Sequence, residues 1–506
     1  MVSSIYSMGF VGIDSFLITV EADISRGLPS FDIVGLPDAS VKESRDRVRS
    51  ALKNSGFNFP VSRIVVNLAP GDVKKYGPIY DLPILLSILA ASGQIDEISK
   101  DSVFIGELSL SGELKHANGI LPMVIKSKEL GIRNVFVPYS NAKEAAVVEN
   151  LNIFPVKTIA DIKNHFSGKL QIQRQPVTKI EFPEKNYSLD FSEIKGQYDA
   201  KRAIEIAVSG GHNILLIGPP GSGKSMLAKR MPSIMPEMTF EEILETTEIY
   251  SILGKLSAEN PLILDRPFRA PHHTISPAGL TGGGTIPKPG EVSLAHNGIL
   301  FLDELPEFSR ISLEVLRQPL EEGMVNISRV KSSLSFPCSF ILVVAMNPCP
   351  CGYYGHPTRQ CTCSQRLVNK YLSKISGPLL DRIDLHIEVP AVEFEKISSN
   401  AEEEKSLSIK ERVLKCRTAQ KKRYNSDRIY NSKADLTKFK DSFKISDSGR
   451  KILKKSFESM GMSARGYEKI LRISRTIADM EGSREIQNDH ILESIQYRTL
   501  DRKYWR

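Results

Sequence analysis

The strongest constraint on the fold of this chain is a glycine-rich segment that directly follows an apolar run at residues 213–217. The segment consists of Gly218, Pro219, Pro220, Gly221, Ser222, Gly223, Lys224 and Ser225. This G-x-x-x-x-G-K-S pattern, between a strand and a helix, is typical of a loop that binds phosphate groups. Its glycines let backbone N–H groups turn toward phosphate oxygens, Lys224 brings positive charge to the β- and γ-phosphates, and Ser225 ligates Mg²⁺. The pattern predicts a site for ATP and Mg²⁺ in an α/β domain with a parallel sheet.

Two further apolar runs, residues 299–302 and 340–345, also lead to polar residues. This is expected of parallel strands, whose carboxyl ends meet at one edge of a sheet. After the first run, Asp303 is placed to hold the Mg²⁺ ion and Glu304 to polarise the attacking water. After the second run, the amide of Asn347 is placed to hydrogen-bond the same water or the γ-phosphate. These residues predict ATP hydrolysis in addition to binding.

Arg382 lies between the end of a predicted helix and a predicted strand, within residues 379–385. An arginine at such a position is suited to reach the nucleotide of a neighbouring subunit as an arginine finger, which stabilises charge on the transferred phosphate. A surface salt bridge is the alternative explanation for this residue.

Composition and periodicity divide the chain into folded regions. Hydrophobic residues make up 41% and charged residues 25% of its 506 residues, which excludes a disordered or coiled-coil chain. Residues 62–156 alternate short β-branched runs with helical patterns, which predicts a layered α/β domain over residues 1–170. Residues 171–188 are polar, contain two prolines and predict a linker. Residues 189–390 form the predicted ATPase core, and residues 391–506 carry helical patterns.

Four of the six cysteines lie close together in a loop at residues 349–363: Cys349, Cys351, Cys361 and Cys363. Six cysteines in a chain of this length are too few for a disulfide framework. Four thiolates from two arms of one loop are enough for a tetrahedral Zn²⁺ site, and four protein ligands would make that metal structural. Four reduced cysteines without a metal are the alternative.

The chain has no long uninterrupted apolar run and no basic segment ahead of an apolar stretch near its start. A membrane-spanning helix and a secretory signal are therefore not expected. These features predict a cytoplasmic protein without a membrane partner.

The order of these motifs resembles that of the AAA+ ATPases of the magnesium-chelatase-like clade. The segments at residues 266–273 (RPFRAPHH), 347–352 (NPCPCG) and 496–502 (QYRTLDR) are similar to those of the bacterial ComM/YifB family in particular. The resemblance implies a homo-hexameric ring with nucleotide at its interfaces and Arg382 acting on a neighbour. It also implies that Arg465, in residues 463–467 (SARGY), is a sensor in a helical lid. The activity implied is that of a DNA helicase or branch-migration motor in recombination during natural transformation. Single-stranded or branched DNA, and recombination proteins, would be its partners.

The first domain of this family resembles the Lon protease fold, but the matching positions here lack catalytic groups. Gly77-Pro78-Ile79 stands where a Gly-Pro-Ser nucleophile would be, and Leu121 stands in place of the catalytic lysine. A Ser-Lys dyad needs an oxygen to attack and an amine to take its proton. The predicted fold is therefore an α/β AAA+ parallel-sheet ATPase core with an inactive N-terminal Lon-protease-like α/β domain and a C-terminal helical lid domain.

The formal net charge of +8 permits a polyanionic partner without requiring one. Lys288, in a Gly/Pro-rich insertion, and Arg329 and Lys331, in a predicted hairpin at residues 325–336, would face the pore of a ring. Such cations would contact DNA phosphates rather than read bases. For the densest basic run, residues 410–428, a solvated helix face and a nucleic-acid contact are equal alternatives.

Two other functions remain open from the sequence. A magnesium-chelatase-like motor subunit would have no use for the Lon-like domain or the cysteine loop, and stimulation of ATP hydrolysis by DNA would argue against it. A non-motor scaffold switched by ATP would need nucleotide binding but no movement along a strand.

Overall fold

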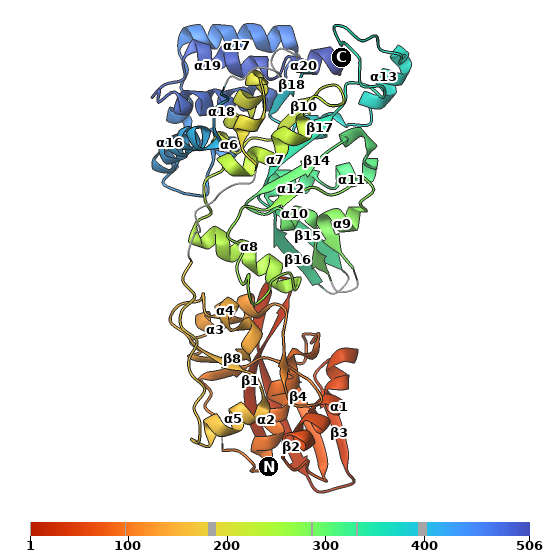
Figure 1. The fold of residues 1–506 in the computed structure, drawn as a ribbon, viewed down its shortest axis with the longest axis vertical. Helices are drawn as coiled ribbons and strands as arrows, with labels where there is room; N and C mark the ends of the chain where they lie inside the picture. Colours follow the sequence, from red (N-terminus) through yellow and green to blue (C-terminus); the bar gives the residue numbers. More distant parts are fainter. Residues whose placement is uncertain are drawn as a thin grey trace. The chain divides into compact units, whose positions relative to one another are not determined.

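The computed structural model describes residues 2–96, 98–180, 189–284, 287–329, 332–392 and 402–505. The chain forms two compact units, which Figure 1 colours along the sequence. Unit 1 comprises Met1–Pro183 and Phe240–Leu264, and unit 2 comprises Glu184–Thr239 and Asp265–Arg506. The chain therefore leaves unit 2 after Thr239 and returns to it at Asp265.

Unit 1 is built on a seven-stranded mixed sheet with the strand order β3-β4-β2-β1-β5-β8-β9. Its strands are β1 (Val2–Val11), β2 (Asp14–Ser25), β3 (Ser30–Val34), β4 (Arg63–Ala69), β5 (Ser102–Phe104), β8 (Asn134–Pro138) and β9 (Asn152–Val156). β2 runs antiparallel to β1 and β4, whereas the ladder from β1 through β5 and β8 to β9 is parallel. A short hairpin of β6 (Glu107–Leu108) and β7 (Leu114–Lys115) stands apart from this sheet.

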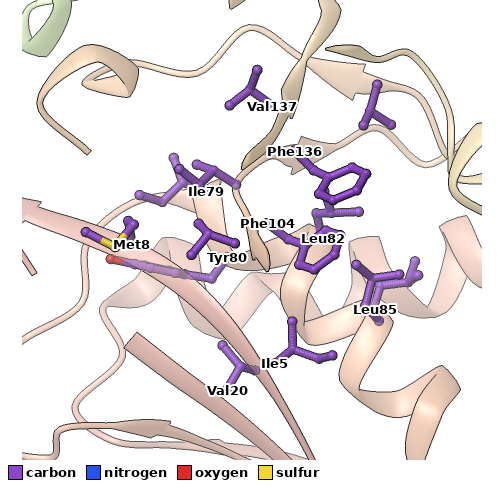
Figure 2. Close-up of a cluster of buried hydrophobic side chains, with 14 of the residues drawn as sticks. Ile5, Met8, Val20, Ile79, Tyr80, Leu82, Leu85, Phe104, Phe136 and Val137 are labelled. Carbon is purple, nitrogen blue, oxygen red and sulfur yellow. The ribbon is translucent and has the colours of Figure 1, made fainter. Parts of the chain in front are cut away.

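The helices of unit 1 include α1 (Ala39–Asn54), α2 (Asp81–Ala91), α3 (Ile120–Glu129), α4 (Ala142–Ala145) and α5 (Ile159–Phe166). All of α2 except Ala90 is buried, because this helix packs against β1 and β2. Figure 2 shows the resulting core, in which the rings of Phe104 and Phe136 stack with their centroids 4.6 Å apart. This apolar core gives unit 1 its own folding stability.

α8 (Phe240–Ile252) is the helix that unit 1 takes from the later part of the sequence. The amide of Gly119 donates to the carbonyl of Ser251 at 3.0 Å, and the Ser251 hydroxyl donates to the buried Glu144 carboxylate. Glu144 also accepts from the Leu121 amide at 3.1 Å and from the Asn141 side chain at 3.0 Å. Because a buried carboxylate is costly unless its oxygens are satisfied, this network fixes α8 within unit 1.

Unit 2 contains a parallel sheet with the strand order β11-β14-β17-β10-β18. The strands are β10 (Ile214–Ile217), β11 (Phe268–Arg269), β14 (Ile299–Leu302), β17 (Ile341–Met346) and β18 (Leu385–Glu388). The three apolar runs identified in the sequence form the three central strands, and every residue of these strands is buried. Such continuous burial is typical of parallel strands that are covered on both faces.

Several helices and two hairpins complete the core of unit 2. The helices are α6 (Tyr198–Gly210), α7 (Lys224–Ile234), α9 (Pro277–Thr281), α10 (Glu291–Leu294), α11 (Arg310–Glu314), α12 (Arg317–Glu322), α13 (Gln365–Leu372) and α14 (Gly377–Leu380). The hairpins pair β12 (Gly282–Gly283) with β13 (Lys288–Pro289), and β15 (Met324–Arg329) with β16 (Ser332–Pro337). The second hairpin lies where the sequence predicts one.

The C-terminal region is helical, as predicted, and it packs on the sheet of unit 2. Its helices are α16 (Ser406–Tyr424), α17 (Asp447–Met460), α18 (Ala464–Met480), α19 (Asn488–Gln496) and α20 (Leu500–Tyr504). Val413 of α16 and Ile473 of α18 share one hydrophobic cluster with Ile214 and Val343 of the sheet. None of the helices in the described ranges is both long and apolar enough to cross a membrane.

The structure differs from the predicted division of the chain in two places. Residues 240–264, predicted to be part of the ATPase core, belong to unit 1. The described part of the predicted linker, residues 171–180, is tied to unit 1 by hydrogen bonds from the Gln175 amide to the Ile153 carbonyl (2.8 Å) and from the Thr178 amide to the Ala146 carbonyl (3.0 Å). Residues 181–188 lie outside the described ranges.

Candidate active site

A cavity of about 380 Å³ lies at the carboxyl edge of the sheet in unit 2. It is lined by the phosphate-binding loop and by the residues that follow two neighbouring strands: Pro220, Gly221, Ser222, Gly223, Lys224, Ser225, Met226, Asp303, Glu304, Met346 and Asn347. β10, β17 and β14 are adjacent and parallel, so their carboxyl ends deliver these side chains to one place. The structure thus brings together Lys224, Ser225, Asp303, Glu304 and Asn347.

The glycines of the loop have the conformation that a phosphate cradle requires. Gly221 and Gly223 have φ values of 76° and 91°, a backbone conformation that residues with a side chain rarely adopt. No atom lies within 4 Å of a Cβ added at either position, so the space above the loop is open. α7 begins at Lys224, and its N-terminal amides therefore point toward this space.

Lys224 is buried and its ammonium group is held by neutral acceptors. Its Nζ donates to the carbonyls of Gly218 and Pro219 at 2.8 Å each, and to Asn347 Oδ1 at 3.2 Å. Burial lowers the pKa of Lys224 to about 8, and the nearby Asp303 opposes this shift. A phosphate in the cavity would give this ammonium group a negatively charged partner.

Ser225 and Asp303 fit a magnesium site. The Ser225 hydroxyl donates to Asp303 Oδ2 at 2.6 Å, so a hydroxyl and a carboxylate, both hard oxygen ligands, already adjoin each other. Mg²⁺ in nucleotide sites is held by one or two such protein oxygens together with phosphates and water. The donor set and its place beside the phosphate cradle therefore suit Mg²⁺-ATP.

Glu304 stands just past Asp303 in a strained backbone conformation. Its φ is 52°, in the left-handed region that non-glycine residues seldom adopt, and its amide donates to Asp303 Oδ1 at 2.9 Å. Its side chain is 59% exposed, and His273 Nδ1 lies 3.6 Å from Glu304 Oε2. The sequence places His273 beside a family motif and favours a structural role for it, whereas this contact brings it to the site.

Arg382 and Arg465 lie elsewhere in unit 2, at a second cavity of about 350 Å³. Asn213 and Asp384 also line this cavity, and they directly precede β10 and β18, so it opens at the amino edge of the sheet. Glu321 binds both arginines: it pairs with Arg382, and its Oε1 lies 3.4 Å from an Arg465 nitrogen. The two arginines are therefore neighbours at the edge opposite the phosphate-binding loop. No sequence motif marked Glu321.

The four clustered cysteines form a compact group of thiols. The Cys349 sulfur lies 3.4 Å from that of Cys351 and 3.7 Å from that of Cys361, and the latter two are 3.5 Å apart. All four sulfurs, including that of Cys363, lie within 4.8 Å of one another. A disulfide would bring two sulfurs to about 2.05 Å, so the cysteines are free and suited to share one ion.

The cations predicted to contact DNA are only partly described. Lys288 is exposed in β13, and Arg329 ends β15 opposite Ser332. Lys331 lies outside the described residues. Their contact with DNA stays a prediction.

Many cations of the basic run at residues 410–428 are engaged within the chain. The partners are Glu237 for Lys410, Glu205 and Glu404 for Arg412, Tyr430 for Arg417, Asp427 for Lys421 and Asp479 for Arg423. These contacts favour a structural role for much of this run.

The positions that match the Lon catalytic dyad lie in the core of unit 1. Ile79 is 6% exposed and Leu121 is fully buried. Figure 2 shows Ile79 among apolar side chains. These positions therefore contribute packing and offer neither a nucleophile nor a base.

The parallel sheet, the phosphate-binding loop and the carboxylates define unit 2 as a P-loop ATPase of the AAA+ class. Residues 190–397 match the family described as magnesium chelatase, subunit ChlI, and residues 20–141 and 403–498 match two further families of the same subunit. The chain is 43% identical over 505 residues to the competence protein ComM of Haemophilus influenzae, covering 98% of this chain and 97% of the relative. It is 39% identical over 502 residues to YifB of Escherichia coli, covering 99% and 97%. A shorter match of 137 residues, 26% identical, relates 26% of this chain to 16% of the Lon protease of Mycoplasma mobile. The chain belongs to the ComM/YifB family of magnesium-chelatase-like AAA+ ATPases.

Proposed function

We propose that this protein is an ATP-hydrolysing motor that assembles into a hexameric ring and moves on DNA. The observation that carries the proposal is the separation of its ATPase residues between two edges of one sheet. The phosphate-binding loop, Asp303 and Glu304 lie at the carboxyl edge, whereas Arg382 and Arg465 lie at the amino edge. A site that needs these arginines must take them from a neighbour, and such a head-to-tail interface closes into a ring when repeated. The number of six subunits follows the resemblance to AAA+ ATPases.

Each residue of the cavity has a separate task in the proposed hydrolysis. Lys224 and the loop amides hold the β- and γ-phosphates in line with the water. Glu304 accepts a proton from that water, and Asn347 orients it. Mg²⁺, held by Ser225 and Asp303, would supply positive charge to the phosphates when bound. Arg382 of a neighbour then stabilises the charge that develops on the γ-phosphate.

We propose DNA as the polymer on which the motor moves because the chain is similar to ComM and carries cations at the predicted pore. The relative ComM is described as a competence protein. We extend this link to the present chain as branch migration or strand separation during recombination in natural transformation, with recombination proteins as further partners. Lys288, Arg329 and Lys331 would hold the phosphate backbone without reading its sequence. We also propose one structural Zn²⁺ per chain at the cysteine cluster.

The test is ATP hydrolysis measured without DNA, with single strands, with duplex and with a four-way junction. The proposal expects stimulation by DNA, strongest with the structure on which the motor acts. Glu304→Gln is expected to bind ATP and stall, because an amide keeps the geometry but cannot accept the proton. Hydrolysis by Glu304→Gln at the parent rate would contradict the assignment of this residue.

A paired variant tests the DNA contacts. Replacing Arg329 and Lys331 by alanine is expected to leave basal hydrolysis intact and to abolish stimulation by DNA. Each lost phosphate contact should reduce the slope of log affinity against log salt by about one unit. A variant that assembles and still moves a junction at the parent rate would remove the support for these two contacts.

A magnesium-chelatase motor subunit is the second candidate, and the names of the matching families favour it. The same hydrolysis measurements separate the two candidates, because a chelatase subunit has no reason to respond to DNA.

A further inference from the structure

The cysteine cluster begins two residues after Asn347 of the active site. We propose that Zn²⁺ bound by Cys349, Cys351, Cys361 and Cys363 sets the position of the phosphate-binding loop, so that nucleotide affinity depends on metal loading. This inference rests on the proposed ATPase function, and it adds a regulator of the same site.

The geometry of the sulfurs suits a tetrahedral ion. With Zn–S bonds of about 2.3 Å, the sulfurs of a tetrahedral site lie about 3.8 Å apart. The three separations among Cys349, Cys351 and Cys361 are 3.4, 3.5 and 3.7 Å. Only small movements would bring these sulfurs onto the corners of a zinc tetrahedron.

The first arm of the cluster touches the phosphate-binding loop at Gly352. A Cβ added there would lie 2.3 Å from Pro220 Cδ and 2.8 Å from Pro220 Cγ, so the proline ring rests directly against this glycine. Gly352 follows the ligand Cys351, and its amide donates to the carbonyl of the ligand Cys349 at 3.0 Å. Gly352 therefore links the ligands Cys349 and Cys351 to the phosphate-binding loop through a close contact with Pro220.

The same arm also reaches the active site at its other end. Asn347 lies two residues before Cys349 and accepts from Lys224 Nζ at 3.2 Å. The arm thus contacts the phosphate-binding loop through Asn347 and through Gly352. A displacement of this arm would move Pro220 and would weaken the contact to Lys224.

The second arm supplies the anchor. Cys361 and Cys363 lead into α13, whose first turn is capped by the Ser364 side chain and whose Tyr371 and Leu372 are buried in the core of unit 2. A metal bound by both arms would hold the first arm to this fixed helix. Without the metal, thiol contacts and local packing would be left to join the two arms.

Linkage gives the first test. If zinc loading strengthens nucleotide binding, then nucleotide must strengthen zinc binding by the same factor. We expect a factor of about ten, within the usual range for two coupled sites. The measurements are affinity for a non-hydrolysable ATP analogue with and without zinc, and zinc affinity by competition with a chelator, with and without the analogue. In protein loaded with Co²⁺ in place of zinc, the analogue should also shift the thiolate-to-metal absorption band.

Two glycine variants give the second test. Gly352→Ala places a methyl group against Pro220, whereas Gly355→Ala lies in the same loop and meets only the Lys503 side chain, at 3.8 Å. Their φ values of 85° and 75° make the backbone strain of the two substitutions comparable. Both variants should retain one zinc per chain. Gly352→Ala should weaken analogue binding about tenfold and lose the linkage, as expected when a coupling contact is broken, and Gly355→Ala should do neither.

Each part of the proposal has its own contradicting result. Protein purified under reducing conditions without chelator that holds no zinc, and gives no thiolate band with Co²⁺, would overturn the metal site. Equal analogue affinity in the two glycine variants, or equal zinc affinity with and without nucleotide, would overturn the coupling. If the linkage holds but no DNA stimulates hydrolysis, the DNA motor fails and the metal coupling stands.

Discussion

Lys224 is a buried ammonium group whose hydrogen-bond partners are neutral, and this predicts a pH-dependent affinity for ATP. Burial lowers its pKa from the usual value near 10.4 to about 8. Below pH 8 the free protein therefore presents a charged group to the phosphates, and above pH 8 binding requires uptake of a proton. We expect ATP affinity to fall about tenfold between pH 7 and pH 9. Titration calorimetry on Glu304→Gln, which should bind ATP without turnover, measures this affinity. Repeating it in buffers of different ionisation heat measures the uptake of the proton.

Lys224→Met is the control for this prediction, because it should bind weakly with no dependence on pH in the same range. An ATP affinity of Glu304→Gln that does not change with pH would contradict the lowered pKa of Lys224.

The same shift in the pKa of Lys224 affects the folding of the nucleotide-free protein. Since the unfolded chain holds a proton on Lys224 that the folded chain has lost, the free energy of unfolding should rise between about pH 8 and pH 10.4.

At the residue scale, the sequence predicts the functional residues that lie next to one another in the chain. The loop from Gly218 to Ser225 and the Asp303-Glu304 pair each sit in one short motif, and the structure brings them to one cavity. Contacts between distant segments have no such signal. The sequence does not distinguish Glu321 from other glutamates, and its role is visible only in the fold, which places Arg382 and Arg465 beside it.

At the scale of elements, α8 is a helix whose local sequence does not reveal the unit on which it packs. It follows α7 and precedes β11, both in unit 2, yet it packs on α3 of unit 1. Periodicity indicates a helix but does not say which sheet it covers. The three central strands of unit 2 were predictable because each is an apolar run with a polar end. No comparable run marks β1, where serines and Gly9 interrupt the apolar residues.

A deletion tests the dependence of α8 on unit 1. Removing residues 1–183 should leave the apolar side chains Leu244 and Leu262 without the core against which they pack. Exposed apolar surface of this kind promotes association. We expect this variant to aggregate in size-exclusion chromatography. A second variant, in which residues 240–264 are also replaced by a Gly/Ser segment of equal length, should elute as a defined species and bind ATP.

The comparison of these two deletions isolates the helix from general damage. If both behave alike and remain dispersed, α8 does not need unit 1 for its burial. If only the second binds ATP, unit 2 contains a complete nucleotide-binding fold, and residues 240–264 are its attachment to unit 1.

At the scale of the whole molecule, the sheet of unit 2 separates the phosphate-binding loop from the arginines. Lys224 follows β10 at the carboxyl edge, whereas Arg382 precedes β18 at the amino edge. Because β10 and β18 are adjacent and parallel, the two residues lie at opposite edges of one sheet. Glu321 binds both Arg382 and Arg465, and in the proposed ring this pair of arginines would meet a neighbour's nucleotide.

This arrangement predicts complementation between two inactive variants. Arg382→Ala keeps an intact loop and Lys224→Ala keeps an intact arginine, so neither should hydrolyse ATP alone. In rings assembled from equal amounts of both, about a quarter of the head-to-tail interfaces join an intact loop to an intact arginine. Hydrolysis should return to about that fraction of the parent rate if interfaces act independently. The matched control mixes Arg382→Ala with the double variant Lys224→Ala/Arg382→Ala, in which no interface has an intact arginine. Recovery in the first mixture alone would place Arg382 in a neighbour's site, whereas no recovery despite demonstrated co-assembly would contradict its action across the interface.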